Sequence, residues 1–575
     1  MAFIKTFLSR HYPACIVALF VAAVVFLPSF LFPFMADSYQ RLNVGNFGVD
    51  EFHYLSMGKE LWEGHSPSNP FLAEGKDWFN PQQVYASYLV LPFRWLGLSE
   101  LGIAGVATLY GLVGVFLLFL LIYFFALQLS RDKRLSLISA LFVVLGYNFL
   151  TNYLFIHHFN MYARPIIPLA SALVFFLYLN LLLKSLQSED RGYAVAAGAV
   201  FGLSFYTYFY AWTFISALNG ILFALLLLAK EREQAKRVLA LTGIGYLLGA
   251  PELYLLYSFS GTEMGRQILL FQGGIETRVF TLVKQSWLVL FFFCLFLYAR
   301  PREKHWPLML SLLLAGIVSI NQGVITGREF QRFHYFWHFI LPTVTVIGAY
   351  LLWQVVTSAL PRRLLFYFLV FILFANGVIQ GILGTFETLP LKNRLQDYRP
   401  IIDRLNLEQS PAVILAANEL PELLFVIYTN HDIFFHHHAG GAYNTSLETL
   451  RDAFFAYTYL DKDARANPRG SILTPSPRDT HPSGIYRELR KYYTTPGMSA
   501  RGAPALRSEA ELQKGLLDGY AALLAEGGMT ELLRRRGVRY IVWDRELTPK
   551  WDLSSLPGLR LLLSSGTVSL YAFTQ

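Results

Sequence analysis

Residues 46–64 read NFGVDEFHYLSMGKELWEG, a stretch that combines an acidic pair with the spacing of a helix. Leu55, Gly58 and Leu61 recur at helical intervals, so we expect a helix that begins at Asp50 and Glu51. Carboxylates in a first helical turn complement the helix dipole, which is the purely structural explanation of this pair. The chemical explanation is a general base or a metal ligand.

The surrounding sequence is dominated by apolar residues. Of the 575 residues, 54% are hydrophobic and only 15% are charged, whereas soluble domains have about 25% charged residues. This composition excludes a disordered chain and an ordinary soluble enzyme. We expect an α-helical polytopic membrane protein with about eleven spans, at 14–34, 102–128, 135–152, 165–183, 193–208, 211–229, 238–258, 281–299, 307–324, 337–357 and 364–386.

The distribution of Lys and Arg predicts the orientation of these spans. With the N-terminus in the cytoplasm, the inside loops hold 16 Lys and Arg in 48 residues, and the outside segments hold nine in roughly 119. The net charge of +9 is therefore spread over short loops, and it forms no basic stripe for nucleic acid. We expect an integral protein of the cell membrane of a bacterium or archaeon, because its two cysteines lie in apolar runs and form no disulfide framework.

Two domains are expected, residues 1–386 in the membrane and residues 387–575 outside the cytoplasm. The second is predicted to be a small α/β domain, because apolar runs shorten and charges return after residue 386. Residues 411–416 and 538–543 have the pattern of buried strands, residues 445–460 and 509–536 that of helices, and residues 465–507 that of a Pro- and Arg-rich connection. The long first outside loop, 35–101, is too rich in aromatic residues to be a simple linker.

Several short motifs carry a family resemblance. VDEFHYL (49–55) follows the first span, Asn80-Pro81 and Tyr85 lie later in the same loop, YARP (162–165) begins a span, and GAVFGLSFYT (198–207) is rich in glycine. In this arrangement residues 10–386 resemble the GT-C superfamily of membrane glycosyltransferases. Protein O-mannosyltransferases and lipid A aminoarabinose transferases share the layout, and the catalytic subunit of oligosaccharyltransferase is more distantly similar.

The resemblance implies an enzyme, a hexosyl- or pentosyltransferase. It would move a sugar, with inversion, from a polyprenyl-phosphate or polyprenyl-diphosphate donor to a lipid, glycan or protein acceptor at the extracytoplasmic face. By match to the family motif, Asp50 is the candidate catalytic base, with Glu51 beside it. Such a transfer needs a carboxylate for the acceptor proton, cations for the departing phosphate and an apolar groove for the lipid.

Three arginines are candidates for the phosphate. Arg328 and Arg332 lie four residues apart in a short outside loop, on one face if that loop is helical. Arg164 precedes Pro165 at the start of a span. The alternatives for the loop pair are anchoring at the membrane interface and pairing with Glu329.

Aromatic and histidine side chains in the outside segments are candidates for substrate binding, with an aromatic membrane belt as the alternative for the tyrosines. The candidates are His53, Tyr54, His157, His158, Tyr208, Tyr210 and His334. The metal site remains unknown. Residues 152–164 contain no acidic residue, which favours a metal-independent reaction. Glu263 and Glu276 are the candidate ligands if a divalent cation takes part. The successive histidines at 436–438 do not converge on one ion from a strand.

Two other functions compete with this interpretation. A transporter or flippase of lipid-linked glycans would place charged groups within its spans, where Glu252 beside Pro251 is the main example. A polymerase or ligase of the O-antigen type would use similar donors on another fold. The acidic pair in the first outside loop favours the glycosyltransferase.

Overall fold

The computed structural model describes most of the chain. The described residues are 2–42, 49–65, 69–76, 86–98, 101–151, 160–261, 275–299, 305–356, 361–416, 419–436, 445–474, 481–494 and 508–574. The side chain of Asp50 lies outside this description.

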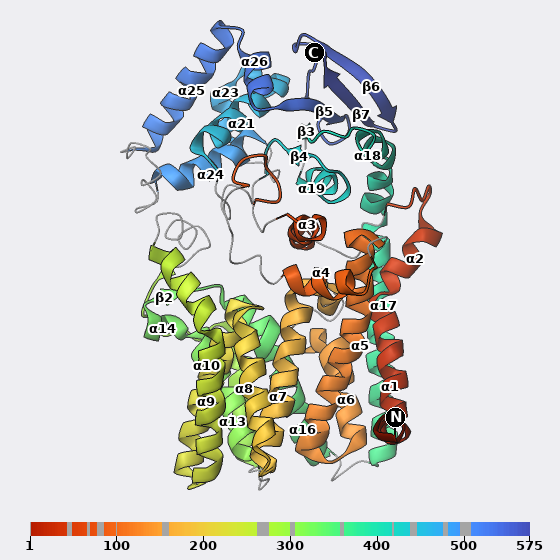
Figure 1. Cartoon of the computed structure of the whole chain (residues 1–575), viewed down its shortest axis with the longest axis vertical. Helices are drawn as coiled ribbons and strands as arrows, with labels where there is room; N and C mark the ends of the chain where they lie inside the picture. Colours follow the sequence, from red (N-terminus) through yellow and green to blue (C-terminus); the bar gives the residue numbers. More distant parts are fainter. Residues whose placement is uncertain are drawn as a thin grey trace.

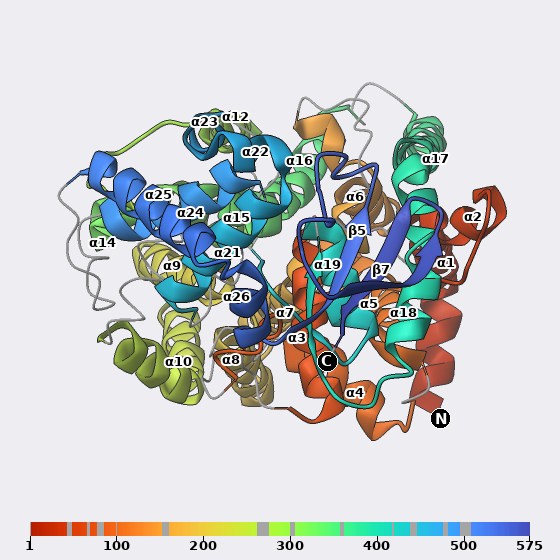
Figure 2. The same ribbon diagram turned by 90° about the horizontal axis from the view of Figure 1, so that it is seen from above.

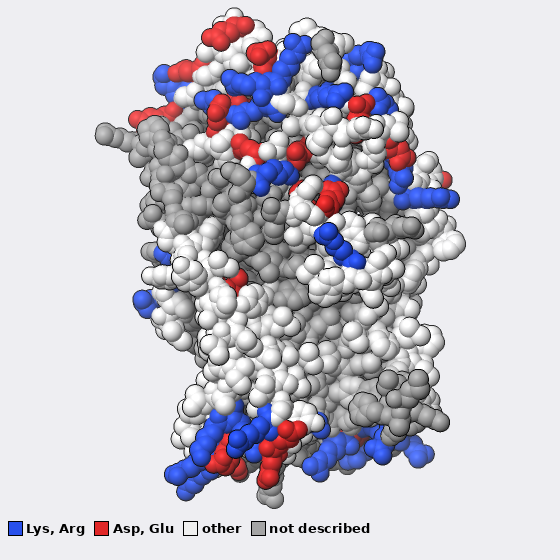
Figure 3. Space-filling view, viewed as in Figure 1, with Lys and Arg blue, Asp and Glu red and all other residues white. Residues whose placement is uncertain are grey.

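The molecule has two layers along its long axis. Apolar helices run side by side in the lower layer, where the N-terminus lies, and a helical and β-sheet unit with the C-terminus covers their upper ends (Figures 1 and 2). On the face drawn in Figure 3, charged side chains gather at the two ends and leave a nearly uncharged band between them. Such a band is expected of a surface that faces lipid.

The lower layer is built from helices that match the predicted apolar runs. Pro28 and Pro33 lie near the bend of 46° in the first run. The elements are α1 (Ala2–Val25), α2 (Leu27–Met35), α5 (Gly102–Ser130), α6 (Lys133–Leu145), η3 (Tyr147–Leu150), η4 (Met161–Ala163), η5 (Pro165–Ala170), α7 (Ser171–Gln187), α8 (Arg191–Phe205), α9 (Phe209–Leu228), α10 (Arg232–Gly261), α12 (Lys284–Ala299), α13 (Trp306–Ile320), α14 (Gln322–Thr326), α15 (Arg332–Tyr335), η6 (Phe336–Ile340), α16 (Leu341–Val356) and α17 (Arg362–Gln396).

Fewer helices than predicted are long enough to cross a membrane unaided. Six described helices are long and apolar enough, or seven if the bent pair α1–α2 counts as one span. Helices α6 and α8 have 13 and 15 residues, below the ~20 that a bilayer core requires. The structure therefore confirms a mostly α-helical protein with helices that are long and apolar enough to span a membrane, and the count of eleven stays a prediction.

The segment predicted as the first outside loop lies between the two layers. It contains α3 (Val49–Glu63), the helix predicted from the acidic pair, and α4 (Ala86–Trp95) (Figure 1). The buried side chain of Gln396, at the end of α17, holds the beginning of this loop. Its amide oxygen accepts hydrogen bonds from the backbone of Gln40 and Leu42, and its amide nitrogen donates to the Leu42 carbonyl.

The upper unit contains a five-stranded mixed sheet in the order β4-β3-β5-β7-β6. Strand β3 pairs in parallel with β4 and β5, and β7 pairs antiparallel with β5 and β6. The elements are α18 (Arg399–Leu405), β3 (Val413–Ala416), α19 (Glu419–Tyr428), β4 (Asp432–Ile433), α21 (Leu447–Leu460), α22 (Lys462–Ala466), α23 (Pro468–Leu473), α24 (Pro482–Thr494), α25 (Glu509–Ala525), α26 (Met529–Arg535), β5 (Val538–Asp544), β6 (Leu559–Ser565) and β7 (Val568–Phe573).

The two predicted strands are confirmed as β3 and β5, and two other predictions need correction. The connection predicted at 465–507 contains α23 and α24, each with a proline at its start, a position where proline stabilises a helix. The helix predicted at 509–536 is divided at Gly527, whose φ of +64° ends α25 in the left-handed conformation. Helix α17 also continues past residue 386 without a break.

Four glycines bring α8 and α10 into close contact. A methyl group on Gly245 would lie 2.0 Å from the ring of Phe201, and one on Gly198 would lie 2.8 Å from Ile244. Gly202 and Gly249 form equivalent contacts with the opposite helix. Small residues four apart allow membrane helices to pack backbone against side chain, so the glycine-rich motif at 198–207 has a packing role.

Gly245→Ala is expected to destabilise the protein by ~1–3 kcal/mol, because the added methyl group displaces Phe201. The matched control is Gly243→Ala in the same helix, where nothing lies within 4 Å of the added atom. That control should be neutral or stabilising, since alanine favours helix. Thermal unfolding in detergent measures both, and equal melting temperatures for the two variants would contradict the packing described.

Candidate functional site

The first turn of α3 carries a fully buried carboxylate. Glu51 has no exposed surface, and its Oε2 accepts a hydrogen bond of 3.2 Å from Nε of Arg164. Arg164 keeps 30% of its side chain exposed. A buried carboxylate needs a cation partner because an uncompensated buried charge costs several kcal/mol. The structure thus joins two of the predicted site residues, which are far apart in the sequence.

The position of Arg164 follows from the irregular backbone before α7. The amide nitrogen of Asn160 donates to the Val144 carbonyl at 2.7 Å, and its amide oxygen accepts from the backbone of Tyr162. The hydroxyl of Tyr147 accepts from the backbone of Met161. These contacts fix residues 160–163, so Arg164 projects from a rigid support.

A second group of predicted residues meets where α9 and α15 begin. The hydroxyl of Tyr208 and Nδ1 of His334 form a short hydrogen bond. The rings of Tyr210 and His334 stack with centroids 4.9 Å apart, and Tyr335 lies edge-on to Tyr210. Tyrosine and imidazole rings offer both a stacking face and polar atoms, a combination that suits a sugar.

His338 belongs to the same aromatic group, although no sequence motif singled it out. Its ring stacks on Tyr208 with centroids 5.2 Å apart. His338 is 8% exposed, and its Nδ1 has no hydrogen-bond partner in the described part of the chain. It lies in the π-helical turn η6, a geometry that is frequent at functional sites. A histidine four residues after His334, inside an apolar run, was the available signal.

The predicted arginine pair does not form on one helical face. Arg328 and Glu329 form strand β2, which pairs with β1 (Ile275–Glu276), and α15 begins only at Arg332. The Arg332 guanidinium makes an ion pair with Glu329, which was the alternative weighed for this loop. The two arginines therefore have different surroundings.

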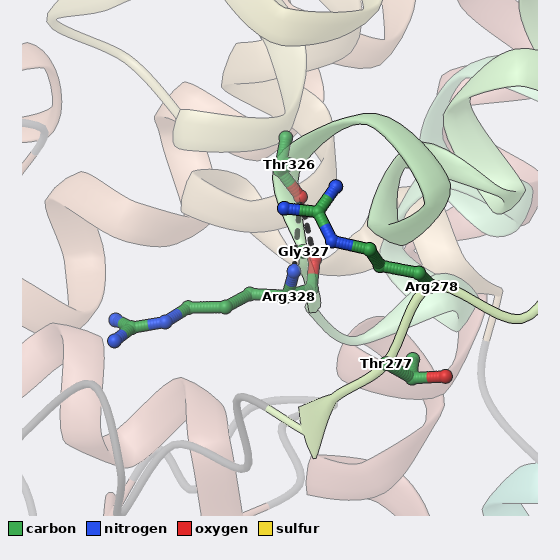
Figure 4. Close-up of a pocket in the computed structure, with 5 residues that line it drawn as sticks. All are labelled: Thr277, Arg278, Thr326, Gly327 and Arg328. Atoms are coloured by element: carbon green, nitrogen blue, oxygen red, sulfur yellow. Dashed lines mark hydrogen bonds between the residues drawn. The ribbon is translucent and has the colours of Figure 1, made fainter.

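Arg328 instead lines a hollow of about 490 Å³ with Thr277, Arg278, Thr326 and Gly327 (Figure 4). Arg278 folds over Gly327 and donates to the carbonyls of Val324 and Ile325 at 3.3 and 3.4 Å. The side chain of Arg328 extends away from Arg278 (Figure 4). The hollow is basic, and Arg278 is a second residue that the sequence analysis did not single out.

Of the remaining predicted residues, the structure describes the side chains of only His53 and Tyr54. The His53 ring stacks on Phe71, with centroids 5.2 Å apart, and Tyr54 lies edge-on to His53. The side chains of Asp50 and Glu276, and residues His157, His158 and Glu263, lie outside the described residues. Among the groups that are described, no three His, Cys, Asp or Glu residues are arranged to hold a metal ion.

Comparison with known proteins identifies the fold. No family model and no curated protein matches the sequence. The crystal structure of ArnT from Cupriavidus metallidurans bound to undecaprenyl phosphate aligns with a TM-score of 0.54 and 12% identity over 98% of each chain. The chain has a GT-C-type fold.

Two further structures are similar at lower scores. Apo ArnT from the same organism gives a TM-score of 0.47 and 12% identity, over 97% of each chain. The oligosaccharyltransferase of Archaeoglobus fulgidus, tethered with an acceptor peptide, gives 0.46 and 14% identity, over 98% of this chain and 74% of that one. The alignment with the ArnT complex, at 12% identity, shows likeness of fold alone, and the predicted resemblance to the GT-C superfamily is confirmed at the level of the fold.

Replacing Arg164 with Met is expected to cost ~3 kcal/mol of stability, because Glu51 loses its guanidinium partner while remaining buried. Glu51→Gln should cost less, since the partly exposed Arg164 can be solvated. Lys236→Gln is the control, because it breaks an exposed pair with Glu233 that solvent screens strongly. Thermal unfolding in detergent ranks the three variants, and an Arg164→Met protein as stable as the control would show that the pair contributes little.

Proposed function

We propose that the chain is a membrane glycosyltransferase that moves a sugar from a polyprenyl-phosphate-linked donor to an acceptor at the extracytoplasmic face, with inversion. The observation that carries the proposal is the buried Glu51–Arg164 pair, which lies at the start of α3 beside Asp50. The pair brings an acidic motif and a phosphate-binding type of side chain together. Helix α3, which carries Glu51, lies between the apolar helices and the upper unit (Figure 1).

The GT-C fold supports the donor class. ArnT from Cupriavidus metallidurans, which has this fold, was crystallised with undecaprenyl phosphate. A polyprenyl chain needs an apolar surface, and the nearly uncharged band of Figure 3 is a surface of that kind. The orientation in this proposal, with the N-terminus in the cytoplasm and the upper unit outside, rests on the Lys and Arg count in the loops.

Asp50 is the proposed general base. In a single displacement, the acceptor hydroxyl attacks the anomeric carbon, its proton passes to Asp50, and the bond from that carbon to the phosphate oxygen breaks. Attack from the face opposite the phosphate inverts the configuration. Glu51 is proposed to hold Arg164 in place and not to accept the proton, since its buried carboxylate is already paired.

Arg164 and His338 are the proposed partners of the departing phosphate. A guanidinium offers planar donors that match phosphate oxygens, and Arg164 retains exposed surface for this contact. Arg328 remains a proposed second cation, whereas Arg332 is engaged with Glu329. Cationic and imidazole groups can stabilise the leaving charge without a divalent ion, so we propose a metal-independent reaction.

The cluster of Tyr208, Tyr210 and His334 is the proposed contact for the sugar. Tyr208 stacks on His338, so the cluster adjoins the proposed phosphate partners. The aromatic belt remains the alternative for tyrosines at this level.

Asp50→Asn is expected to lower the rate of sugar transfer by ~10²–10⁴, because the amide keeps the shape of the side chain and removes its basicity. The measurement is transfer of labelled sugar from a polyprenyl-linked donor in membranes that contain each variant at matched expression. Glu63→Gln, at the other end of α3 where Glu63 pairs with Lys59, is the control and should retain nearly the parent rate. Unimpaired transfer by the Asp50→Asn protein would remove Asp50 from the mechanism.

A further inference from the structure

The far end of α3 and the segment that follows it, residues 69–76, are attached to the C-terminal unit. The backbone carbonyl of Phe71 accepts a hydrogen bond of 2.8 Å from Ile433 of strand β4. Asn69 supports this contact, because its side-chain oxygen accepts from the backbone of Phe71 and Leu72. Residues 69–72 thus lie against the edge of the C-terminal sheet, although they belong to the first outside loop.

A stack of three rings joins α3 to the C-terminal unit. The Phe71 ring lies between the imidazoles of His53 and His436, with centroid distances of 5.2 and 4.7 Å and interplanar angles of 30° and 22°. Phe71 and His436 have no exposed surface. His53 lies two residues after Glu51 on α3, so the stack contacts this helix close to the proposed catalytic turn.

Charged contacts join the same elements further along the helix. Lys76 binds Glu60 of α3 at 3.3 Å and Asp432 of β4 at 3.0 Å. Burial alone lowers the pKa of Lys76, but the two carboxylates outweigh it and raise the pKa above its usual value, so Lys76 is charged at neutral pH. Lys59 of α3 also donates to the carbonyl of Thr429.

Glu74 binds residues 69–76 to a second element of the C-terminal unit, helix α21. Its carboxylate accepts hydrogen bonds from the backbone and hydroxyl of Ser446, at 2.8 and 3.2 Å, and from the hydroxyl of Thr449 at 2.8 Å. Ser446 is the N-cap of α21, so a carboxylate from the first outside loop completes the cap of a helix in the C-terminal unit.

We infer that the C-terminal unit positions the Glu51 end of α3. Phe71 and Lys76 are the positioning residues, because their side chains connect α3 to that unit. The polar and aromatic contacts fix α3 along its length, at His53, Lys59 and Glu60. The base beside Glu51 must be held to well within 1 Å for efficient proton transfer. The C-terminal unit then acts in the reaction through α3 and is more than a cover over the site.

The test compares Phe71→Leu and Lys76→Gln with the parent full-length protein in detergent. Leucine keeps the apolar volume and removes the ring stack; glutamine removes the charge that joins Glu60 to Asp432. Hydrogen–deuterium exchange of residues 49–63 should become several-fold faster in both variants. The turnover number kcat for sugar transfer should fall by ~10–10²-fold with the KM for the donor unchanged, and Lys76→Arg should restore most of it.

Matched controls lie in the same unit away from α3. Phe455→Leu removes a buried ring that contacts Tyr520, and Lys514→Gln breaks an exposed pair with Asp518. Both should leave kcat and the exchange of residues 49–63 near the parent values. A general weakening of the unit would affect the Phe455 variant as much as the Phe71 variant, and that result would overturn the inference.

The measurement of kcat rests on the proposed function, whereas the hydrogen–deuterium exchange measurement needs no sugar donor. Parent-like exchange of residues 49–63 in both test variants would overturn the inference whatever the chain catalyses. Faster exchange with parent-like kcat would also overturn it, because α3 would then be held without consequence for the reaction. Absence of transfer by the parent protein would instead refute the proposed function, and exchange alone would then decide whether the unit holds α3.

Discussion

The ion pair between Glu51 and Arg164 is the interaction on which the architecture of the site depends. A carboxylate without exposed surface requires a cation, and the cation here comes from the irregular segment before α7. Meeting this requirement brings the loop after the first apolar run against the start of a helix more than a hundred residues later. Asn160 and Tyr147 fix the arginine from one side, and α3 fixes the glutamate from the other. The chemistry proposed for Asp50 relies on that geometry.

The sequence predicted the helices and strands whose patterns are local. Apolar runs identified the helices of the lower layer, the spacing of Leu55, Gly58 and Leu61 identified α3, and β-branched runs identified β3 and β5. Hydrophobic patterns were less informative where a single glycine or proline decides where a helix begins or ends. Gly527 ends a helix that the apolar spacing would continue, and prolines at the start of α23 and α24 favour helix where composition indicates a connection. By length and composition, six described helices qualify as spans, or seven with the bent pair α1–α2, and the count of eleven stays a prediction.

Contacts between distant segments could not be read from one sequence. The pairing of Arg164 with Glu51, the stacking of His338 on Tyr208 and the bridge from Lys76 to Asp432 each join residues far apart in the chain. Arg328 and Arg332 show the converse limit: a helical face was expected, but pairing with β1 makes Arg328 part of a strand, and Glu329 binds Arg332. Residue types indicate which chemical groups are present, and the fold decides which of those groups meet.

Binding of a polyprenyl-phosphate donor beside the acidic motif is tested most directly by an experimental structure of the full chain with bound polyprenyl phosphate. We expect the phosphate within hydrogen-bond distance of Arg164, near His338 and the first turn of α3, with the lipid chain along the apolar helices. A phosphate bound away from Arg164, with Asp50 and Glu51 outside its reach, would contradict the claim.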